Sequence, residues 1–241
     1  MRLVICLPTY NERANLEPIA RRLGDVLEGV DAEPRVLVID DSSPDGTGEL
    51  ADRLSGELSF LSVLHRTRKE GLGPAYVAGF RWALDHGAER IVQMDADFSH
   101  DPGDLPRLLA ATKAPGLALG SRYVEGGGTE NWGKGRRAIS RFGSFYARTI
   151  LGVPVRDLTG GFKCWRRETL EALPLDRIRT KGYAFQIETT YRTIRAGFEV
   201  AEVPIVFAER RSGGSKMTRG IILEAMWKVP ELRVRGALNH L

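Results

Sequence analysis

The sequence predicts an α/β fold, a twisted and mainly parallel sheet with helices on both faces. Short apolar runs recur through residues 1–100, as expected of strands that are covered on both sides. Each run leads into a polar turn and then into apolar residues at helical spacing. With 241 residues, the chain is long enough to bury one α/β core. These observations favour β-α units in series within one α/β domain.

Four such units follow one another before residue 100. Their strands are predicted at Leu3–Leu7, Arg35–Ile39, Phe60–Leu64 and Ile91–Met94, and helices at Asn15–Leu27 and Ala75–Leu84. Ligands of parallel sheets bind beyond the carboxyl ends of the strands, where the polar turns of all four units fall.

Gly71-Leu72-Gly73 opens the helix of the third unit. It lacks the third glycine of a dinucleotide fingerprint and does not follow the first strand, so a dinucleotide oxidoreductase is disfavoured. We expect a helix entry in which the glycines provide turn geometry. A phosphate loop assisted by Lys69 is the alternative.

Asp95 and Asp97 directly follow the fourth strand. Residues i and i+2 of a strand share a face, so both carboxylates can reach one hard divalent cation. Mg²⁺ and Mn²⁺ favour carboxylate and phosphate oxygens, which makes a nucleotide diphosphate the natural companion. An acidic turn or a helix N-cap is the alternative.

The second half of the chain is less regular. A short strand is expected at Leu117–Leu119, and the glycine-rich segment Val124–Gly135 is expected to be mobile, as a lid or as a plain loop. The helix predicted at Arg136–Leu151 has apolar residues on one face, which indicates core or a partner surface. These residues are Ile139, Phe142, Tyr146 and Ile150.

A helix is predicted at Ala184–Ala196, with Gln186 and Glu188 near its start, and a strand at Val200–Phe207. Glu188 either fixes a loop or faces a sugar. The basic loop Glu209–Lys216 follows the strand and either closes on phosphate or forms an exposed turn. Met217–Leu241 is expected to form an amphipathic basic segment that contacts anionic lipid or its own domain. Pro230 should kink or end its helix.

Composition excludes several classes of protein. Hydrophobic residues make up 42% and charged residues 27%, which is ordinary for a soluble globular protein. No apolar run approaches the ~20 residues that span a bilayer, and the start lacks the features of a secretory signal, so we expect a cytoplasmic protein. The charge of +4 comes with basic clusters, but no zinc-finger, RNP or helix-turn-helix pattern points to nucleic acid.

Taken together, the motifs resemble those of the dolichyl-phosphate, or polyprenyl-phosphate, β-mannosyltransferases, within the inverting GT-A glycosyltransferases. The resemblance covers Leu3 to about Met217, so residues 1–216 are expected to form the catalytic domain, followed by the segment 217–241. The motifs are Pro8–Glu12, Asp40–Thr47, Gly71–Gly73, Asp95–His100, Gly120–Tyr123, Asp157–Phe162 and Arg210–Lys216.

This resemblance implies a site residue by residue. The nucleoside of GDP-mannose is expected to contact Pro8, Tyr10, Glu12, Ile39 and Asp41. Asp95, Ala96 and Asp97 are expected to hold the metal, ribose and diphosphate, and Ser99 stands where some relatives have a glutamine metal ligand. Arg210 and Lys216 match residues that close over the donor, while Arg122, Arg136 and Ser140 match the acceptor-phosphate site. Asp95, Asp97, Arg122 and Arg210 are the expected catalytic residues, with Arg122 also contacting the donor.

The implied reaction transfers mannose from GDP-mannose to a polyprenyl phosphate with inversion, assisted by Mg²⁺ or Mn²⁺. Many relatives carry transmembrane helices after the catalytic domain, whereas this chain resembles the short soluble type. It is therefore expected to attach peripherally to the cytoplasmic face of a membrane, or through a membrane-embedded partner protein. The alternatives are a polyprenyl-phosphate glucosyltransferase that uses UDP-glucose and a nucleotide-sugar-binding protein without turnover.

Overall fold

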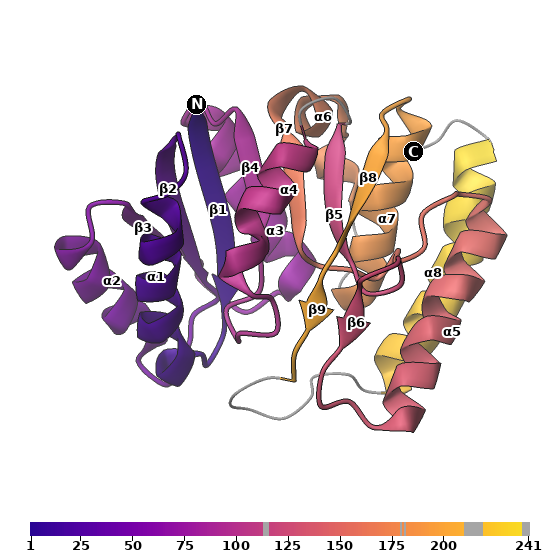
Figure 1. The fold of residues 1–241 in the computed structure, drawn as a ribbon, viewed down its shortest axis with the longest axis horizontal. Coiled ribbons are helices and arrows are strands. Elements are labelled where there is room, and N and C mark those ends of the chain that lie inside the picture. The colour runs from indigo at the N-terminus through magenta and orange to yellow at the C-terminus, as the bar shows by residue number, and fades with distance from the viewer. Residues whose placement is uncertain (113–115, 179, 181, 210–218, 238–241) are drawn as a thin grey trace.

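The central sheet confirms the predicted fold class. The structure, a computed structural model, describes residues 1–112, 116–178, 180, 182–209 and 219–237. Within these residues seven strands form one sheet in the order β3-β2-β1-β4-β7-β5-β8 (Figure 1). All neighbours are parallel except β7, which runs antiparallel to β4 and β5. The strands are β1 (Arg2–Thr9), β2 (Glu33–Asp40), β3 (Leu61–His65), β4 (Arg90–Gln93), β5 (Leu117–Ser121), β7 (Lys163–Arg166) and β8 (Val200–Pro204).

Helices cover both faces of this sheet, because successive strand side chains point to opposite sides. In β1, Leu3, Ile5 and Leu7 belong to one apolar cluster, and Val4 and Cys6 to another. The first cluster packs under α1 (Arg13–Leu27), α2 (Thr47–Glu57) and α4 (Leu105–Ala111). The second packs under α3 (Leu72–Asp85), α6 (Arg167–Ala172) and α7 (Gly182–Arg195). Two short 3₁₀ helices lie at Pro102–Asp104 and Leu175–Arg177.

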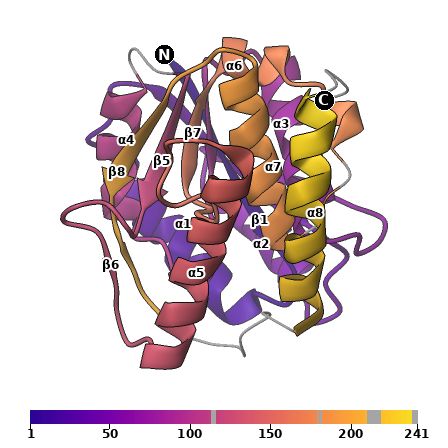
Figure 2. The ribbon, with the colours of Figure 1, turned by 90° about the vertical axis from the view of Figure 1, so that its right-hand side faces the viewer.

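Two long helices, α5 (Lys134–Leu151) and α8 (Arg219–Ala237), lie side by side beyond α7 (Figure 2). A third apolar cluster joins them to α7 and includes Leu151, Ile187, Tyr191, Val229 and Leu232. The C-terminal helix thus contributes to the core of the domain.

The helix α8 differs from the expectation in two respects. It continues through Pro230 to its end, so this proline does not terminate it. Where its side chains are described, apolar residues lie on both sides, since Val229 and Leu232 are buried while Trp227 is 79% exposed. This part of α8 is therefore not amphipathic in the simple sense predicted.

The strand predicted at 200–207 is divided. β8 ends at Pro204, and β9 (Val206–Phe207) pairs in parallel with β6 (Gly128–Thr129), which lies inside the glycine-rich segment. Trp132 of the same segment is only 5% exposed. The segment therefore has a strand pairing and an aromatic anchor that sequence reasoning missed.

The apolar face predicted on α5 does not enter the core. Ile139, Phe142 and Ile150 are exposed, Phe142 by 62%, whereas Tyr146 packs against the third cluster. The prediction that this face packs in the core is wrong for these three residues, and the alternative, that it contacts a partner, stays a prediction. Among the described helices, none has the length and apolarity needed to cross a bilayer.

Candidate active site

A cavity opens at the carboxyl ends of β1, β2 and β4, as the β-α pattern predicts. The strand order places the β2 and β1 loops on one side of β4, and β7 with its neighbours on the other. The cavity is lined by Pro8, Tyr10, Glu12, Asp41, Lys69, Asp95, Ala96, Asp97, His100, Arg122, Arg136, Thr159, Gly161, Tyr183, Gln186 and Phe207, among others. Most of the predicted site residues therefore meet in one place.

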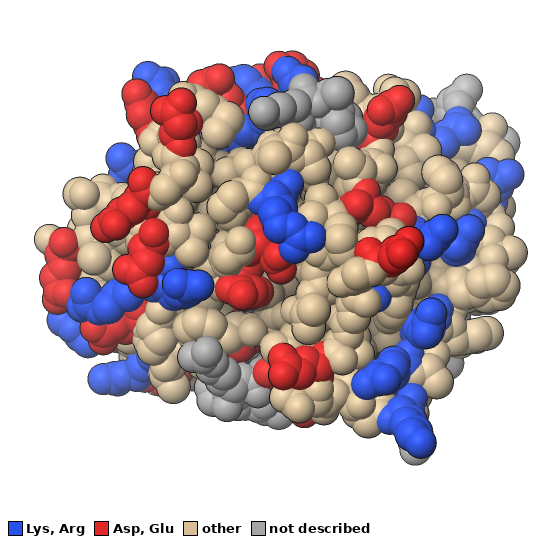
Figure 3. Space-filling view, in the orientation of Figure 1, with Lys and Arg blue, Asp and Glu red and all other residues tan. Residues whose placement is uncertain are grey.

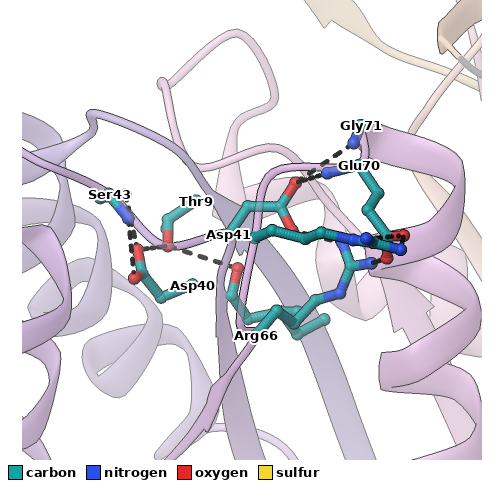
Figure 4. Close-up of polar contacts among 9 residues, drawn as sticks. Thr9, Asp40, Asp41, Ser43, Arg66, Glu70 and Gly71 are labelled. Atoms are coloured by element: carbon teal, nitrogen blue, oxygen red, sulfur yellow. Dashed lines mark hydrogen bonds and ion pairs between the residues drawn. The ribbon is translucent and has the colours of Figure 1, made fainter.

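Asp41 organises the side of the cavity that is expected to hold the nucleoside (Figure 4). Its Oδ1 pairs with Arg66, and its Oδ2 accepts the backbone N–H groups of Glu70 and Gly71 at 3.3 Å each. The side chains of Arg66 and Glu70 also form an ion pair at 2.5 Å. Asp41 thus fixes the loop that enters α3 and also borders the cavity.

The entry to α3 confirms turn geometry for Gly71, whereas Gly73 lies within the helix and allows a close approach. Gly71 has a φ of 103°, a conformation that side chains rarely adopt. A Cβ on Gly73 would lie 2.5 Å from the carbonyl oxygen of Thr180 and 3.0 Å from Phe185. Only glycine lets these two segments approach so closely.

Two nucleoside-side predictions have different outcomes. Tyr10 borders the cavity, and the Lys69 ammonium lies 3.6 Å from the centre of its ring, a cation–π contact. Ile39 instead is fully buried in the cluster between the sheet and α3 and does not line the cavity that the described residues form.

Asp95 lies just beyond β4 and is held by two buried residues. The Tyr76 hydroxyl donates to its Oδ1 at 3.1 Å, and its backbone N–H donates to Nδ1 of His100 at 3.2 Å. The neutral His100 ring therefore carries its proton on Nε2, which has no hydrogen-bond partner among the described residues. Burial lowers the pKa of His100 and keeps the ring neutral.

A strained turn holds Asp97. Phe98 has a φ of 62°, in the left-handed region that a bulky residue rarely adopts. This turn brings the backbone N–H and the hydroxyl of Ser99 to Oδ1 of Asp97, at 3.0 and 2.6 Å. In this structure Ser99 therefore orients Asp97, and its metal-ligand role stays a prediction.

The donor set fits a hard divalent cation that shares its ligands with a substrate. Asp95 and Asp97 both border the cavity, and Oδ2 of Asp95 accepts no hydrogen bond from the residues described. No cluster of three or more His, Cys, Asp or Glu side chains suited to a metal occurs in the described part of the chain. Two carboxylates, completed by phosphate and water, are what Mg²⁺ sites commonly use.

Arg122 forms a buried two-pronged ion pair with Asp157. Its Nε and Nη2 each donate to one carboxylate oxygen at 2.7 Å, and its backbone N–H donates to Oδ2 at 3.0 Å. Nη2 also donates to Thr159 at 2.7 Å. Burial alone would lower the pKa of Arg122, but the charge of Asp157 raises it overall. The Arg122 guanidinium, expected at the acceptor phosphate, thus directs Nε and Nη2 at Asp157, and only Nη1 has no hydrogen-bond partner among the described residues.

Arg136 and Ser140 lie on the first turns of α5. The Arg136 guanidinium stacks 4.1 Å from the centre of the Trp132 ring and pairs with Glu209 at 3.0 Å. It borders the cavity, whereas Ser140 is buried and accepts a hydrogen bond from Tyr123 at 2.7 Å. The structure therefore brings Arg136, but not Ser140, to the cavity that the described residues line.

Three residues discussed in the sequence analysis remain, Arg210, Lys216 and Glu188. Arg210 and Lys216 lie outside the described residues. Glu188 is buried, pairs with Arg192 at 2.6 Å and accepts the Thr180 hydroxyl at 2.5 Å. It therefore fixes the segment before α7 and does not face the cavity.

Sequence reasoning missed several residues of the site. Tyr76 reads as an ordinary apolar position of α3, and His100 as part of a turn signal. The partnership of Asp157 with Arg122 has no local sequence signal. Trp132 could have been found as the single large apolar residue in a glycine-rich segment.

Comparisons with known proteins show the family of the chain. The model of the family described as "Glycosyl transferase family 2" matches residues 4–173. The chain is 49% identical over 229 residues to the undecaprenyl-phosphate mannosyltransferase of Micrococcus luteus, covering 95% of this chain and 93% of that protein. It is 48% identical over 241 residues to the polyprenol monophosphomannose synthase of Mycolicibacterium smegmatis, covering 99% and 89%.

A solved structure shares the fold. It is the glucosyl-3-phosphoglycerate synthase of Mycobacterium tuberculosis in complex with Mn²⁺, uridine diphosphate and glucosyl-3-phosphoglycerate, with a TM-score of 0.65 and 20% identity. The match covers 99% of this chain and 79% of that one, and it confirms the GT-A fold expected from the motifs. With the family model and both relatives spanning most of its length, the chain belongs to glycosyl transferase family 2 and to the group of polyprenyl-phosphate mannosyltransferases within it.

Proposed function

We propose that this protein transfers mannose from GDP-mannose to a polyprenyl phosphate with inversion, and that Mg²⁺ or Mn²⁺ assists the transfer. The observation that carries the proposal is the meeting of Asp95 and Asp97 with Tyr10 and Asp41 on one side and Arg136 on the other, in one cavity. The names of the two relatives, a mannosyltransferase and a phosphomannose synthase, support the sugar and the lipid class.

The donor would lie across the ends of the strands. Pro8, Tyr10 and Asp41 border the side expected to hold the nucleoside, and Asp95 and Asp97 the middle, where the diphosphate belongs. A cation bound by these carboxylates would supply Lewis-acid stabilisation of the leaving diphosphate. Arg210 and Lys216 are proposed to add positive charge there.

The acceptor needs no separate general base. A phosphate monoester has a second pKa of about 6, so its oxygen is already largely anionic near neutral pH. The task of the chain is then to align that oxygen with the anomeric carbon, opposite the leaving group. Arg136, and Nη1 of Arg122 held rigidly by Asp157, are proposed to orient the acceptor phosphate. A single displacement gives the β-mannosyl phosphate.

The decisive experiment offers two donors. The purified protein is given GDP-mannose or UDP-glucose, each with polyprenyl phosphate and Mg²⁺ or Mn²⁺, and the lipid product is analysed for its sugar. Mannosyl phosphoryl polyprenol from GDP-mannose alone is expected. A glucosylated lipid would establish the glucosyltransferase alternative, and GDP binding without transfer would establish a non-catalytic nucleotide-sugar-binding protein.

The same proposal includes peripheral attachment to the cytoplasmic face of a membrane. On α5, Arg136 borders the cavity, while Ile139, Phe142 and Phe145 are exposed. Trp227 of α8 is also exposed. Lys and Arg side chains gather over the lower part of α5 (Figure 3). Apolar side chains edged by basic ones suit an anionic lipid surface, and they lie close to the site of the lipid acceptor.

Liposome flotation tests this attachment. Deleting residues 217–241 would also remove Val229 and Leu232 from the third cluster, so surface substitutions are the cleaner variants. Phe142→Ser with Phe145→Ser is expected to reduce flotation with anionic vesicles, since both side chains are more than half exposed. Equal flotation of this variant and the wild type would refute attachment through α5 and leave a membrane-embedded partner as the alternative.

A further inference from the structure

A buried polar cluster behind the cavity is not used by the chemistry described so far. It consists of Gln93, Lys163, Gln186 and Thr189, and only Gln186 borders the cavity. Buried polar groups are costly unless they are hydrogen-bonded, so four of them together indicate a purpose beyond packing.

The side chain of Gln186 is fixed from the metal-binding strand. Gln93, the last residue of β4, donates its Nε2–H to Oε1 of Gln186 at 2.6 Å. Asp95 follows Gln93 by two residues, so the amide of Gln186 is held in register with the carboxylate.

The backbone of Gln186 is fixed from the neighbouring strand. Lys163 of β7 is paired with Gln93 in the sheet and is fully buried. Its Nζ donates to the carbonyl oxygen of Gln186 at 2.9 Å and to the Thr189 hydroxyl at 3.0 Å. Both ends of Gln186 are thus anchored, which limits the positions its amide can take.

With its oxygen bound to Gln93, Gln186 turns its NH₂ group toward the cavity. A methyl group built on Gly161 would lie 3.4 Å from Nε2 of Gln186, 3.5 Å from His100 and 3.8 Å from Oδ2 of Asp95. Nε2 donates to none of the residues described, although Gln186 is only 3% exposed. The cavity therefore holds an oriented, neutral donor beside the metal-binding carboxylate.

The position of this donor selects its ligand. In a nucleotide sugar the nucleoside, diphosphate and sugar follow in that order. The nucleoside side lies at the β1 and β2 loops and the diphosphate at Asp95 and Asp97, so the sugar falls toward β7 and α7, where Gln186 lies. A neutral amide N–H matches an uncharged hydroxyl better than a phosphate, which favours arginine.

We infer that Gln186 donates a hydrogen bond from Nε2 to one hydroxyl of the transferred hexose, and that Gln93 and Lys163 act as positioning residues for it. The inference rests on the proposed function. A site built to bond a hydroxyl discriminates against the sugar that lacks it, because the buried donor is then left unpaired. Gln186 thereby contributes to the choice of sugar.

The test compares the wild type with Gln186→Met, which keeps the length of the side chain and removes the donor. kcat/KM is measured with GDP-mannose and with its 2-, 3-, 4- and 6-deoxy analogues. For the wild type, kcat/KM is expected to be about five- to tenfold lower with one of the analogues than with GDP-mannose, which corresponds to the loss of one neutral hydrogen bond. For Gln186→Met, kcat/KM with GDP-mannose is expected to fall by the same factor, and kcat/KM with that analogue is expected to be no lower than with GDP-mannose. If the variant still discriminates against every analogue as the wild type does, the inference is overturned.

Thr190→Val is the matched control. Thr190 is buried one turn after Gln186 in α7 and donates to the Gln186 carbonyl at 3.0 Å, but it does not border the cavity that the described residues line. Thr190→Val is expected to discriminate between GDP-mannose and its deoxy analogues as the wild type does. If Gln186→Met does not fold, the double variant with Gln93→Leu removes both partners and is measured in the same way.

Failure of the proposed function gives a different result. If the wild type transfers no mannose, binding is compared between GDP-mannose and GDP. The Gln186 inference then requires that the wild type bind GDP-mannose more tightly than GDP and that Gln186→Met abolish that difference. An unchanged difference would overturn it.

Discussion

The buried pair between Asp157 and Arg122 offers the sharpest test of how the site is held together. We predict that Asp157→Asn destabilises the protein, because it leaves the Arg122 charge buried with one weakened partner. Removing one member of a buried ion pair costs about 3–5 kcal/mol. Asparagine keeps the shape and one acceptor oxygen, so we expect the lower end, about 3 kcal/mol. In a chain of 241 residues this corresponds to a fall in Tm of roughly 6–12 °C.

The sign of the pH dependence follows from the same contact. Burial alone would raise the pKa of Asp157, but the charge and hydrogen bonds of Arg122 lower it overall. The stabilisation is therefore present above the unfolded-state pKa of about 3.9 and is lost as pH falls through the lower folded-state value.

Urea unfolding of the wild type and Asp157→Asn at neutral and acidic pH measures both effects. The difference in unfolding free energy should shrink in acid. The double variant Arg122→Met with Asp157→Leu should be more stable than Asp157→Asn, because it leaves no unpaired charge. If Asp157→Asn lowered the unfolding free energy by less than about 1 kcal/mol at neutral pH, the view that Asp157 fixes Arg122 would be refuted.

Three further predictions concern the metal site, the buried lysine and the entry to α3. Asp97→Ala should abolish most metal-dependent transfer, at least about 100-fold, and should also lower Tm modestly, because the two Ser99 donors lose their acceptor. Burial lowers the pKa of Lys163 well below its usual value. Below about pH 10.4 the unfolded state therefore binds more protons than the folded state, so the unfolding free energy of the wild type should rise with pH, by at most about 1.4 kcal/mol per pH unit. Urea unfolding of Lys163→Met should not show this rise. Gly73→Ala should lower the unfolding free energy by about 1–3 kcal/mol, because its methyl would meet the Thr180 carbonyl.

Two variants serve as controls for these measurements. Asp101→Ala removes a carboxylate from the same loop as Asp97, where it caps a short helix by accepting the Gly103 N–H, and it should retain transfer. Gly56→Ala places a methyl group in α2 where nothing lies within 4 Å, so it should not destabilise the protein. A Gly56 variant as unstable as the Gly73 variant would contradict the argument from close approach.

The first four β-α units could be read from the sequence, because their signals are local. Continuous apolar runs indicate strands that are covered on both faces, and helical spacing shows which side of each helix is apolar. The position of Asp95 and Asp97 follows from the same logic, since they directly succeed β4. Gly71 was likewise interpreted correctly as the turn before a helix, whereas the close packing of Gly73 against Thr180 and Phe185 had no local signal.

Contacts between distant residues could not be read in this way. Arg122 and Asp157 are 35 residues apart, and Gln93 and Gln186 are 93 apart. Several different pairings satisfy the same local pattern, and only the packing of the whole chain selects one. For the same reason Ile39, a plausible nucleoside contact by its place in the motif, lies in the core.

The sequence by itself determined a mainly parallel sheet with a carboxylate pair at the end of its fourth strand. The tertiary structure decided that β7 enters antiparallel between β4 and β5, which brings Lys163 beside Gln93 and both under Gln186. It also decided that one apolar side of α5 stays exposed. The physical reason is that periodicity shows which face of an element is apolar, whereas the partner that covers that face is set by where the other elements pack.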